Sequence, residues 1–169
     1  MKKIFSITGT IITIILMVVF IILCSFIVMN PYNTNNELLV KELYSLRETQ
    51  EFHINDIIPF DWDEMYVFKS GTSKEYIEKT INISNSKITN VPEDENTTGI
   101  VFLKDGKITA YFPSTKDSHS FKINVPMGNN NHGVVKQYEW VVFMAENKDG
   151  IINLTEMTLP FVGGHKYTD

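Results

Sequence analysis

The C-terminal half of the chain is organised around the stretch Ile100-Val101-Phe102-Leu103-Lys104-Asp105-Gly106-Lys107-Ile108-Thr109-Ala110-Tyr111-Phe112. Two apolar runs, residues 100–103 and 108–112, flank the dipeptide Asp105-Gly106. A two-residue hairpin turn needs positive φ at both positions, which Gly adopts freely and Asp tolerates. The stretch therefore predicts two antiparallel strands joined by a tight turn.

The segments after this hairpin also have the pattern of β-strands. Residues 138–145 and 151–159 are mostly apolar and flank the polar residues 146–150, which predicts a second hairpin with a longer loop. Residues 120–125 alternate apolar and polar side chains, as in a strand with one solvated face. Residues 126–133 are expected to form a loop. The second half therefore predicts about five antiparallel strands.

Two helices are expected before these strands. Asn36 is a favourable N-cap and leucines repeat at helical spacing behind it, so a helix is predicted over residues 37–50. The segment Thr72-Ser73-Lys74-Glu75 has the form of a capping box, which predicts a second helix over residues 73–81. Between these helices, residues 65–68 are all large and apolar or aromatic, as in a strand buried on both faces.

The order of these segments predicts the fold class. Helix, strand and helix followed by several strands indicate an α+β fold, with two short helices packed on an antiparallel sheet of five to six strands. Residues 37–169 contain no repeat or long linker, and their length suits one domain. Residues 30–36 are expected to be a polar spacer in front of this domain.

The N-terminal residues 4–29 are uncharged and mostly apolar. As a helix they would extend roughly 39 Å, more than the hydrocarbon core of about 30 Å, so they predict a transmembrane helix. A cleavable secretory signal would have a shorter apolar stretch and a small-x-small cleavage site. A lipoprotein signal would place a small residue directly before the modified cysteine, whereas Leu23 precedes Cys24. An uncleaved single-pass anchor over residues 1–29 fits best.

The basic residues predict the orientation of this anchor. Lys2 and Lys3 flank its N-terminal side, and the next basic residue is Lys41. The positive-inside bias then places the N-terminus in the cytoplasm and the C-terminal domain outside the cell membrane. Cys24 is the only cysteine and lies inside the apolar run, so the domain is expected to have no disulfide.

The charge of the domain bears on its partners. All 20 acidic residues lie beyond residue 29, together with all of the 15 basic residues except Lys2 and Lys3. The domain is therefore more acidic than the net charge of −5 of the whole chain, which argues against binding to nucleic acid. The expected partners are the membrane, through the anchor, and an unidentified protein.

No residue pattern reaches the specificity of a catalytic, cofactor-binding or metal-binding signature. The histidines lack the spacing of zinc ligands, and no cysteine is available in the domain. The sequence also lacks the nucleophile motifs of hydrolases and the glycine loops that bind phosphate. No catalytic, cofactor or metal residue is therefore assigned. The four histidines are His53, His119, His132 and His165.

The densest acidic and aromatic cluster contains Asp61, Trp62, Asp63 and Tyr66. Carboxylates beside an aromatic side chain could form an acid/base pair or a cation site. A calcium loop would need further oxygen ligands at alternate positions and a glycine turn, which are missing here. At the start of a strand, Asp often caps a turn and Trp anchors the core, so the structural role is favoured.

The segment from Phe60 to Phe68, followed by Thr72-Ser73-Lys74-Glu75, resembles a family of small bacterial proteins. These are uncharacterised membrane- or lipid-anchored proteins that carry a Phe-Asp-Trp-Asp-x-x-Tyr-x-Phe strand and a Thr-Ser-Lys-Glu helix start. In that family a Pro-Tyr-Thr commonly joins strand and helix, whereas Ser70-Gly71-Thr72 stands here. The resemblance covers about 20 residues. It implies an exported α+β domain and no particular activity.

Two functions follow as hypotheses. The first is a membrane-anchored, extracytoplasmic binding protein, in one form an immunity or inhibitor protein whose acidic domain neutralises a basic partner. The second is an envelope-acting hydrolase that uses Asp61 or Asp63 with a histidine. A concave pocket that unites these side chains would favour the hydrolase, whereas a buried Trp62 with neighbouring carboxylates bound to backbone amides would favour the structural role.

Overall fold

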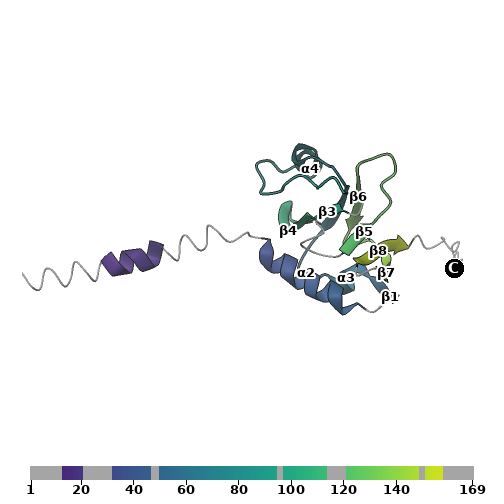
Figure 1. Ribbon diagram of the computed structural model, residues 1–169, viewed down its shortest axis with the longest axis horizontal. Coiled ribbons are helices and arrows are strands. Elements are labelled where there is room, and N and C mark those ends of the chain that lie inside the picture. Colours follow the sequence, from purple (N-terminus) through teal and green to yellow (C-terminus); the bar gives the residue numbers. More distant parts are fainter. Residues whose placement is uncertain are drawn as a thin grey trace, which may run out of the picture. The chain divides into compact units, whose positions relative to one another are not determined.

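In the computed structural model the chain forms two compact units, Met1–Asn33 and Thr34–Asp169 (Figure 1). The residues that the structure describes are 13–20, 32–46, 50–94, 97–113, 121–148 and 151–157.

The first unit corrects the expected membrane anchor. Within it, residues 13–20 form a helix. Among the described residues, no helix is both long enough and apolar enough to cross a membrane. Eight helical residues extend about 12 Å, against a hydrocarbon core of about 30 Å. The prediction of a transmembrane helix over residues 4–29 is therefore wrong on this finding; residues 1–12 and 21–31 lie outside the described part.

The second unit contains helices and strands in mixed order, so the α+β class is confirmed. Its elements are α2 (Asn33–Ser45), β1 (Gln50–His53), α3 (Ile54–Ile57), β2 (Glu64–Lys69), α4 (Lys74–Thr80), β3 (Thr98–Lys104), β4 (Lys107–Pro113), β5 (Phe121–Asn124), β6 (His132–Lys136), β7 (Val142–Lys148) and β8 (Ile151–Met157).

The strands form two sheets, which corrects the prediction of one sheet with five to six strands. Sheet A has the order β1-β7-β8-β5, and sheet B has the order β4-β3-β2-β6. The described strand pairs are antiparallel except β5 and β8, which run parallel. Some strands that follow one another in the chain therefore belong to different sheets. After the β3-β4 hairpin of sheet B, β5 joins the edge of sheet A, and β6 then joins the edge of sheet B.

Both predicted hairpins are confirmed. In the first, Asp105 and Gly106 have φ angles of 50° and 68°, as the two-residue turn requires. In the second, β7 and β8 pair from Val142 opposite Met157 to Lys148 opposite Ile151. The predicted strand over residues 120–125 exists as β5, but its parallel pairing differs from the expected antiparallel one.

The first helix differs from the prediction at its N-terminus. It begins at Asn33, so Asn36 is not an N-cap and residues 33–36 belong to the helix. Instead, the Asn36 side chain donates to the Tyr111 carbonyl at 2.7 Å and accepts from the Tyr111 amide at 3.2 Å. Asn35 donates to the Thr109 carbonyl at 2.8 Å. These side-chain amides bind backbone groups at the edge of β4 that no neighbouring strand pairs with. Left unpaired, such groups could pair with a strand of another chain.

The helix α4 begins with a different cap from the predicted one. Ser73 is the N-cap, and its hydroxyl accepts from the Tyr76 amide at 3.3 Å. The Thr72 hydroxyl donates instead to the Lys69 carbonyl at 2.6 Å, which closes the turn after β2. Ile77 is buried, as the predicted helix requires.

Three segments have other structures than the sequence predicts. Residues 50–53 form the edge strand β1 and do not continue the first helix. Residues 132–136 form strand β6, whose start falls in the predicted loop. Residues 138–141 precede β7 and form a turn, although their pattern predicts the start of that strand.

The main core lies between the two sheets and α2 (Figure 1). Phe112 of sheet B meets Phe121 of sheet A edge to face, with ring centroids 5.6 Å apart. Leu39 and Leu43 of α2 pack against the same cluster. The fully buried side chains of this core include Trp62, Met65, Val67, Ile100, Phe102, Phe112, Phe143 and Leu154.

Candidate functional site

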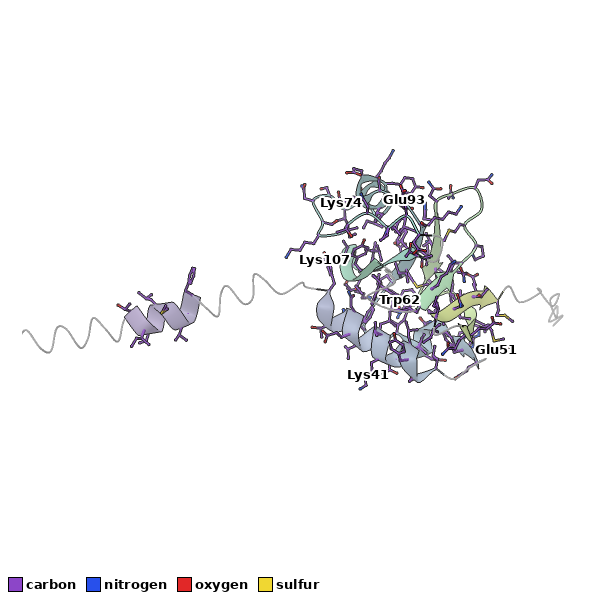
Figure 2. The ribbon with its side chains drawn as sticks, in the orientation of Figure 1. Lys41, Glu51, Trp62, Lys74, Glu93 and Lys107 are labelled. Atoms are coloured by element: carbon purple, nitrogen blue, oxygen red, sulfur yellow. The ribbon has the colours of Figure 1, made fainter. Side chains whose placement is uncertain are left out.

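Trp62 is a core residue and not part of an exposed site. Only 1% of its surface is exposed, and Figure 2 shows it inside the domain. Its ring meets Phe102 edge to face, with centroids 5.9 Å apart. This is the structural role that the sequence favoured, because an aromatic side chain of this size stabilises a core by the apolar area that it buries.

Asp63 holds the β3-β4 turn and the chain after β6. Its carboxylate accepts from Lys104 Nζ and from the Asp105 amide, both at 2.7 Å. Its carbonyl accepts from the Gln137 amide at 2.8 Å. The hydrogen bond from Lys104 and that from the Asp105 amide lower the pKa of the Asp63 carboxyl, so it is poorly suited to act as a general acid. The neighbouring Asp61 is exposed.

Tyr66 lies on the outer face of sheet B, and its hydroxyl donates to Glu64 Oε2 at 2.9 Å. Burial, with a smaller contribution from Glu64, raises the pKa of Tyr66 to about 12. A hollow of about 310 Å³ lies beside Asp63. Among the described residues its lining contains no histidine, so the acid/base pair of the hydrolase hypothesis is not assembled there. The lining residues are Asp63, Glu64, Leu103, Gly106, Lys136, Gln137 and Tyr138.

The described histidines lie in different sheets. His53 ends β1 of sheet A, and its ring contacts Trp140. His132 starts β6 of sheet B, and its Nδ1 lies 3.2 Å from the Tyr76 hydroxyl. Within the described part of the chain, no three His, Cys, Asp or Glu residues are placed to hold a metal ion. His119 and His165 lie outside that part.

Among the residues that the structure describes, the most exposed large aromatic side chains lie in the turn between β6 and β7. We call residues 137–141 the aromatic turn. Tyr138 is 80% exposed and Trp140 is 77% exposed. The centroids of the Trp140 and His53 rings are 3.9 Å apart, so the indole packs on one neighbour while most of its surface faces solvent.

Hydrogen bonds fix the aromatic turn at both ends. The Gln137 amide donates to the Asp63 carbonyl at 2.8 Å, and the Gln137 carbonyl accepts from the Asn55 side chain at 2.8 Å. The Glu139 carboxylate accepts from the Lys136 amide at 3.0 Å. At the other end, the Ile54 amide donates to the Val141 carbonyl at 3.4 Å. The aromatic side chains are thus presented by an ordered backbone.

The outer face of sheet A continues from this turn. Along β7, Phe143 and Ala145 are buried, whereas Val142 and Met144 are half-buried. Met157, which pairs with Val142, is half-buried as well. In the described part of the chain, no side chain on this outer face is fully buried. The face therefore has no helix packed over it among these residues.

Acidic side chains border this surface. A hollow of about 560 Å³ lies between the end of α2 and β1, and its lining includes Glu51, His53 and Asp56. On β8, Glu156 pairs with the buried Phe143 and so belongs to the other side of sheet A, and its pKa is raised, first by burial and second by the charge of Glu139 in the aromatic turn. We call the exposed and half-buried surface of this region the aromatic face. It is formed by Glu51, His53, Tyr138, Trp140, Val142, Met144 and Met157.

Sequence reasoning did not find the aromatic face. The order Gln137-Tyr138-Glu139-Trp140 alternates polar and aromatic residues, which is the pattern of a half-buried strand. The backbone turns at these positions instead, so both aromatic side chains reach solvent. The available signal was weak: two aromatic residues on either side of Glu139, directly before an apolar strand.

Comparison of the chain with protein-family models, with curated proteins and with solved structures gave no match. The resemblance to small anchored bacterial proteins therefore stays a prediction.

Proposed function

We propose that the second unit is a protein-binding domain, and that the aromatic face is its binding surface. The observation that carries the proposal is the pair of exposed aromatic side chains, Tyr138 and Trp140, on an ordered turn. Trp and Tyr are the residues most enriched among those that dominate binding energy in protein interfaces.

The order of the turn supports this function. A side chain that is already held in its bound position loses little conformational entropy on association. Here both ends of the aromatic turn are held by hydrogen bonds to Asp63, Asn55 and Ile54. Met144 and Met157 lie half-buried on the outer face of sheet A, and flexible thioethers adapt readily to a partner surface.

The charge of the domain favours a basic partner. The whole chain has a net charge of −5, and its acidic residues lie beyond residue 29. Complementary charge accelerates encounter and disfavours wrong partners. An immunity or inhibitor protein that neutralises a basic protein is the form of this function that we favour. It stays a prediction that the protein acts outside the cell membrane. This prediction makes no statement about how the N-terminal residues are attached.

The test compares two exposed aromatic sites of the full chain. Proteins retained by the immobilised wild-type chain are identified, and the dissociation constant of each purified candidate is measured by calorimetry. The variant Tyr138→Ser/Trp140→Ser is expected to bind at least about tenfold more weakly, the loss typical for a central aromatic residue. Tyr44→Ser is the control, because Tyr44 is also a solvent-exposed tyrosine, with 57% of its surface exposed, but belongs to α2.

The proposal fails if both variants bind the candidate with the affinity of the wild-type chain. It also fails if Tyr44→Ser weakens binding as strongly as the double substitution, because the interface would then lie on α2.

A further inference from the structure

The hollow that His53 lines combines acidic and apolar side chains. It lies between the end of α2 and β1 and encloses about 560 Å³. Two carboxylates, those of Glu51 and Asp56, belong to its lining, and both residues are exposed. No lysine or arginine is part of this lining among the described residues.

Trp140 is not one of the residues that line this hollow, but it contacts His53, which is. The rings of His53 and Trp140 are tilted by 50° with centroids 3.9 Å apart, and His53 itself lines the hollow. The Nδ1 atom of His53 is buried and has no hydrogen-bond partner among the residues that the structure describes. The hollow is thus lined by two carboxylates and an imidazole ring, and the exposed indole of Trp140 lies against that imidazole.

We propose that the aromatic face binds a basic segment of the partner protein by receiving an arginine side chain between Trp140 and the carboxylates of Glu51 and Asp56. This inference rests on the proposed binding function and names the chemistry of the partner. A guanidinium stacks on the face of an indole and donates to carboxylates at its edge, so one side chain satisfies both features.

The charge of the chain agrees with this occupant. Its net charge is −5, so it attracts a cationic segment of a partner. A second copy of this acidic chain would instead bring like charges together, which disfavours self-association through the same face.

The experiment observes the two tryptophans of the full chain directly. In a nitrogen-15 correlation spectrum, Trp62 and Trp140 give separate indole signals, which the variant Trp140→Phe assigns. The chain is titrated with N-acetyl-arginine amide and, separately, with N-acetyl-citrulline amide, which has the same shape without the charge. We expect only the arginine compound to move the Trp140 signal, whereas the signal of the buried Trp62 stays in place.

A matched pair of variants tests the carboxylates. Glu51→Gln/Asp56→Asn is expected to weaken binding of the arginine compound about threefold or more, as expected for the loss of exposed charge pairs. Glu75→Gln/Glu93→Gln changes the net charge equally and is expected to leave the affinity unchanged. Glu51 and Glu93 lie far apart in the domain (Figure 2).

Three results would overturn the inference. The citrulline compound could move the Trp140 signal as far as the arginine compound, the control pair could weaken binding equally, or the signal could move on concentrating the chain alone, which would identify a second copy as the occupant. If the arginine compound has no effect while Tyr138→Ser/Trp140→Ser still weakens binding of the isolated partner, this inference fails and the proposed function stands.

Discussion

The two sheets bury their inner faces in the same core but differ in what lies on their outer faces. On sheet B, Phe68, Val101 and Tyr111 are buried, and α4 with the segment that follows it covers this side of the sheet (Figure 1). The Tyr111 hydroxyl donates to the Thr89 carbonyl at 2.8 Å, which ties this cover to the edge strand β4. On sheet A, the corresponding side chains Val142 and Met144 are only half-buried.

This difference assigns the two sheets different tasks. The cover of sheet B extends the apolar core to a second layer and contributes to stability. Sheet A leaves apolar side chains at its surface, and the aromatic turn leads into its strand β7. The exposed side chains of Tyr138 and Trp140 in this turn contribute little to the core. Exposed aromatic residues beside a half-buried sheet face are typical of an interaction surface.

The largest contrast is expected between the two tryptophans. Trp62→Ala should destabilise the domain by about 3–5 kcal/mol, because it removes a fully buried ring from the core. Trp140→Ala should change the free energy of unfolding by no more than about 0.5 kcal/mol, as expected for a surface position. Urea denaturation of both variants measures the difference. Equal losses would place Trp140 in the core and remove the basis of the binding surface.

A methyl group added at Gly99 should push the segment after α4, which covers sheet B, away from that sheet. A Cβ at Gly99 would lie 2.5 Å from Val91 Cγ2, so Gly99→Ala forces the cover away and should cost about 1–3 kcal/mol. Thr155→Ala on the exposed face of sheet A is the control and should have little effect. Thermal unfolding of the two variants tests the contrast, and similar melting temperatures would show that sheet B is not tightly covered.

The hairpin turn of sheet B should respond to backbone strain. Gly106 has a φ of 68°, and a Cβ added there would meet no atom within 4 Å, so Gly106→Val introduces strain without a clash. The expected cost is about 1–2 kcal/mol, because a β-branched residue is disfavoured at positive φ. Lys107→Val, at a position next to the turn with ordinary backbone angles, is the comparison. Chemical denaturation measures both variants, and a Gly106→Val variant as stable as the wild-type chain would contradict the turn geometry.

The sequence predicted those features that depend on neighbouring residues. Asp105-Gly106 determines its turn locally, and the segment Thr72–Glu75 indicates where α4 begins, although Ser73 and not Thr72 is its cap. The division into two sheets depends on pairing over long distances, as between β1 and β7, and no local pattern contains it. Asn36 suits a helix cap by residue preference, whereas its amide pairs with Tyr111 far along the chain.

The candidate surface was unpredictable for a related reason. Whether Trp140 is exposed depends on where the chain turns relative to both sheets. Asp63 and Ile54, which are remote in sequence, provide the hydrogen bonds that fix this turn. The cluster at residues 61–66 has the acidic and aromatic composition of a site, but its Trp62 is buried and its Asp63 carboxylate is bound by Lys104 and the Asp105 amide.

The smallest expected effect concerns Glu156 at the border of sheet A. Its folded pKa is raised above the ordinary value of 4.5, so the folded state binds this proton more tightly than the unfolded state. Stability contributed by this group is present below pH 4.5 and is lost as the pH rises through the folded pKa. Glu156→Gln should therefore slightly raise the melting temperature at pH 7. Glu146→Gln, an exposed position on β7, should not, and an equal rise in both variants would point to net charge instead.

The most direct test of the binding surface uses methionine methyl groups. Met144 and Met157 lie half-buried on the outer face of sheet A, whereas Met65 is fully buried. In the complex of the full chain with its isolated partner, saturation of the partner's protons should attenuate the methyl signals of Met144 and Met157 and spare that of Met65. Unchanged Met144 and Met157 signals in a complex that forms would contradict the assignment of the aromatic face as the binding surface.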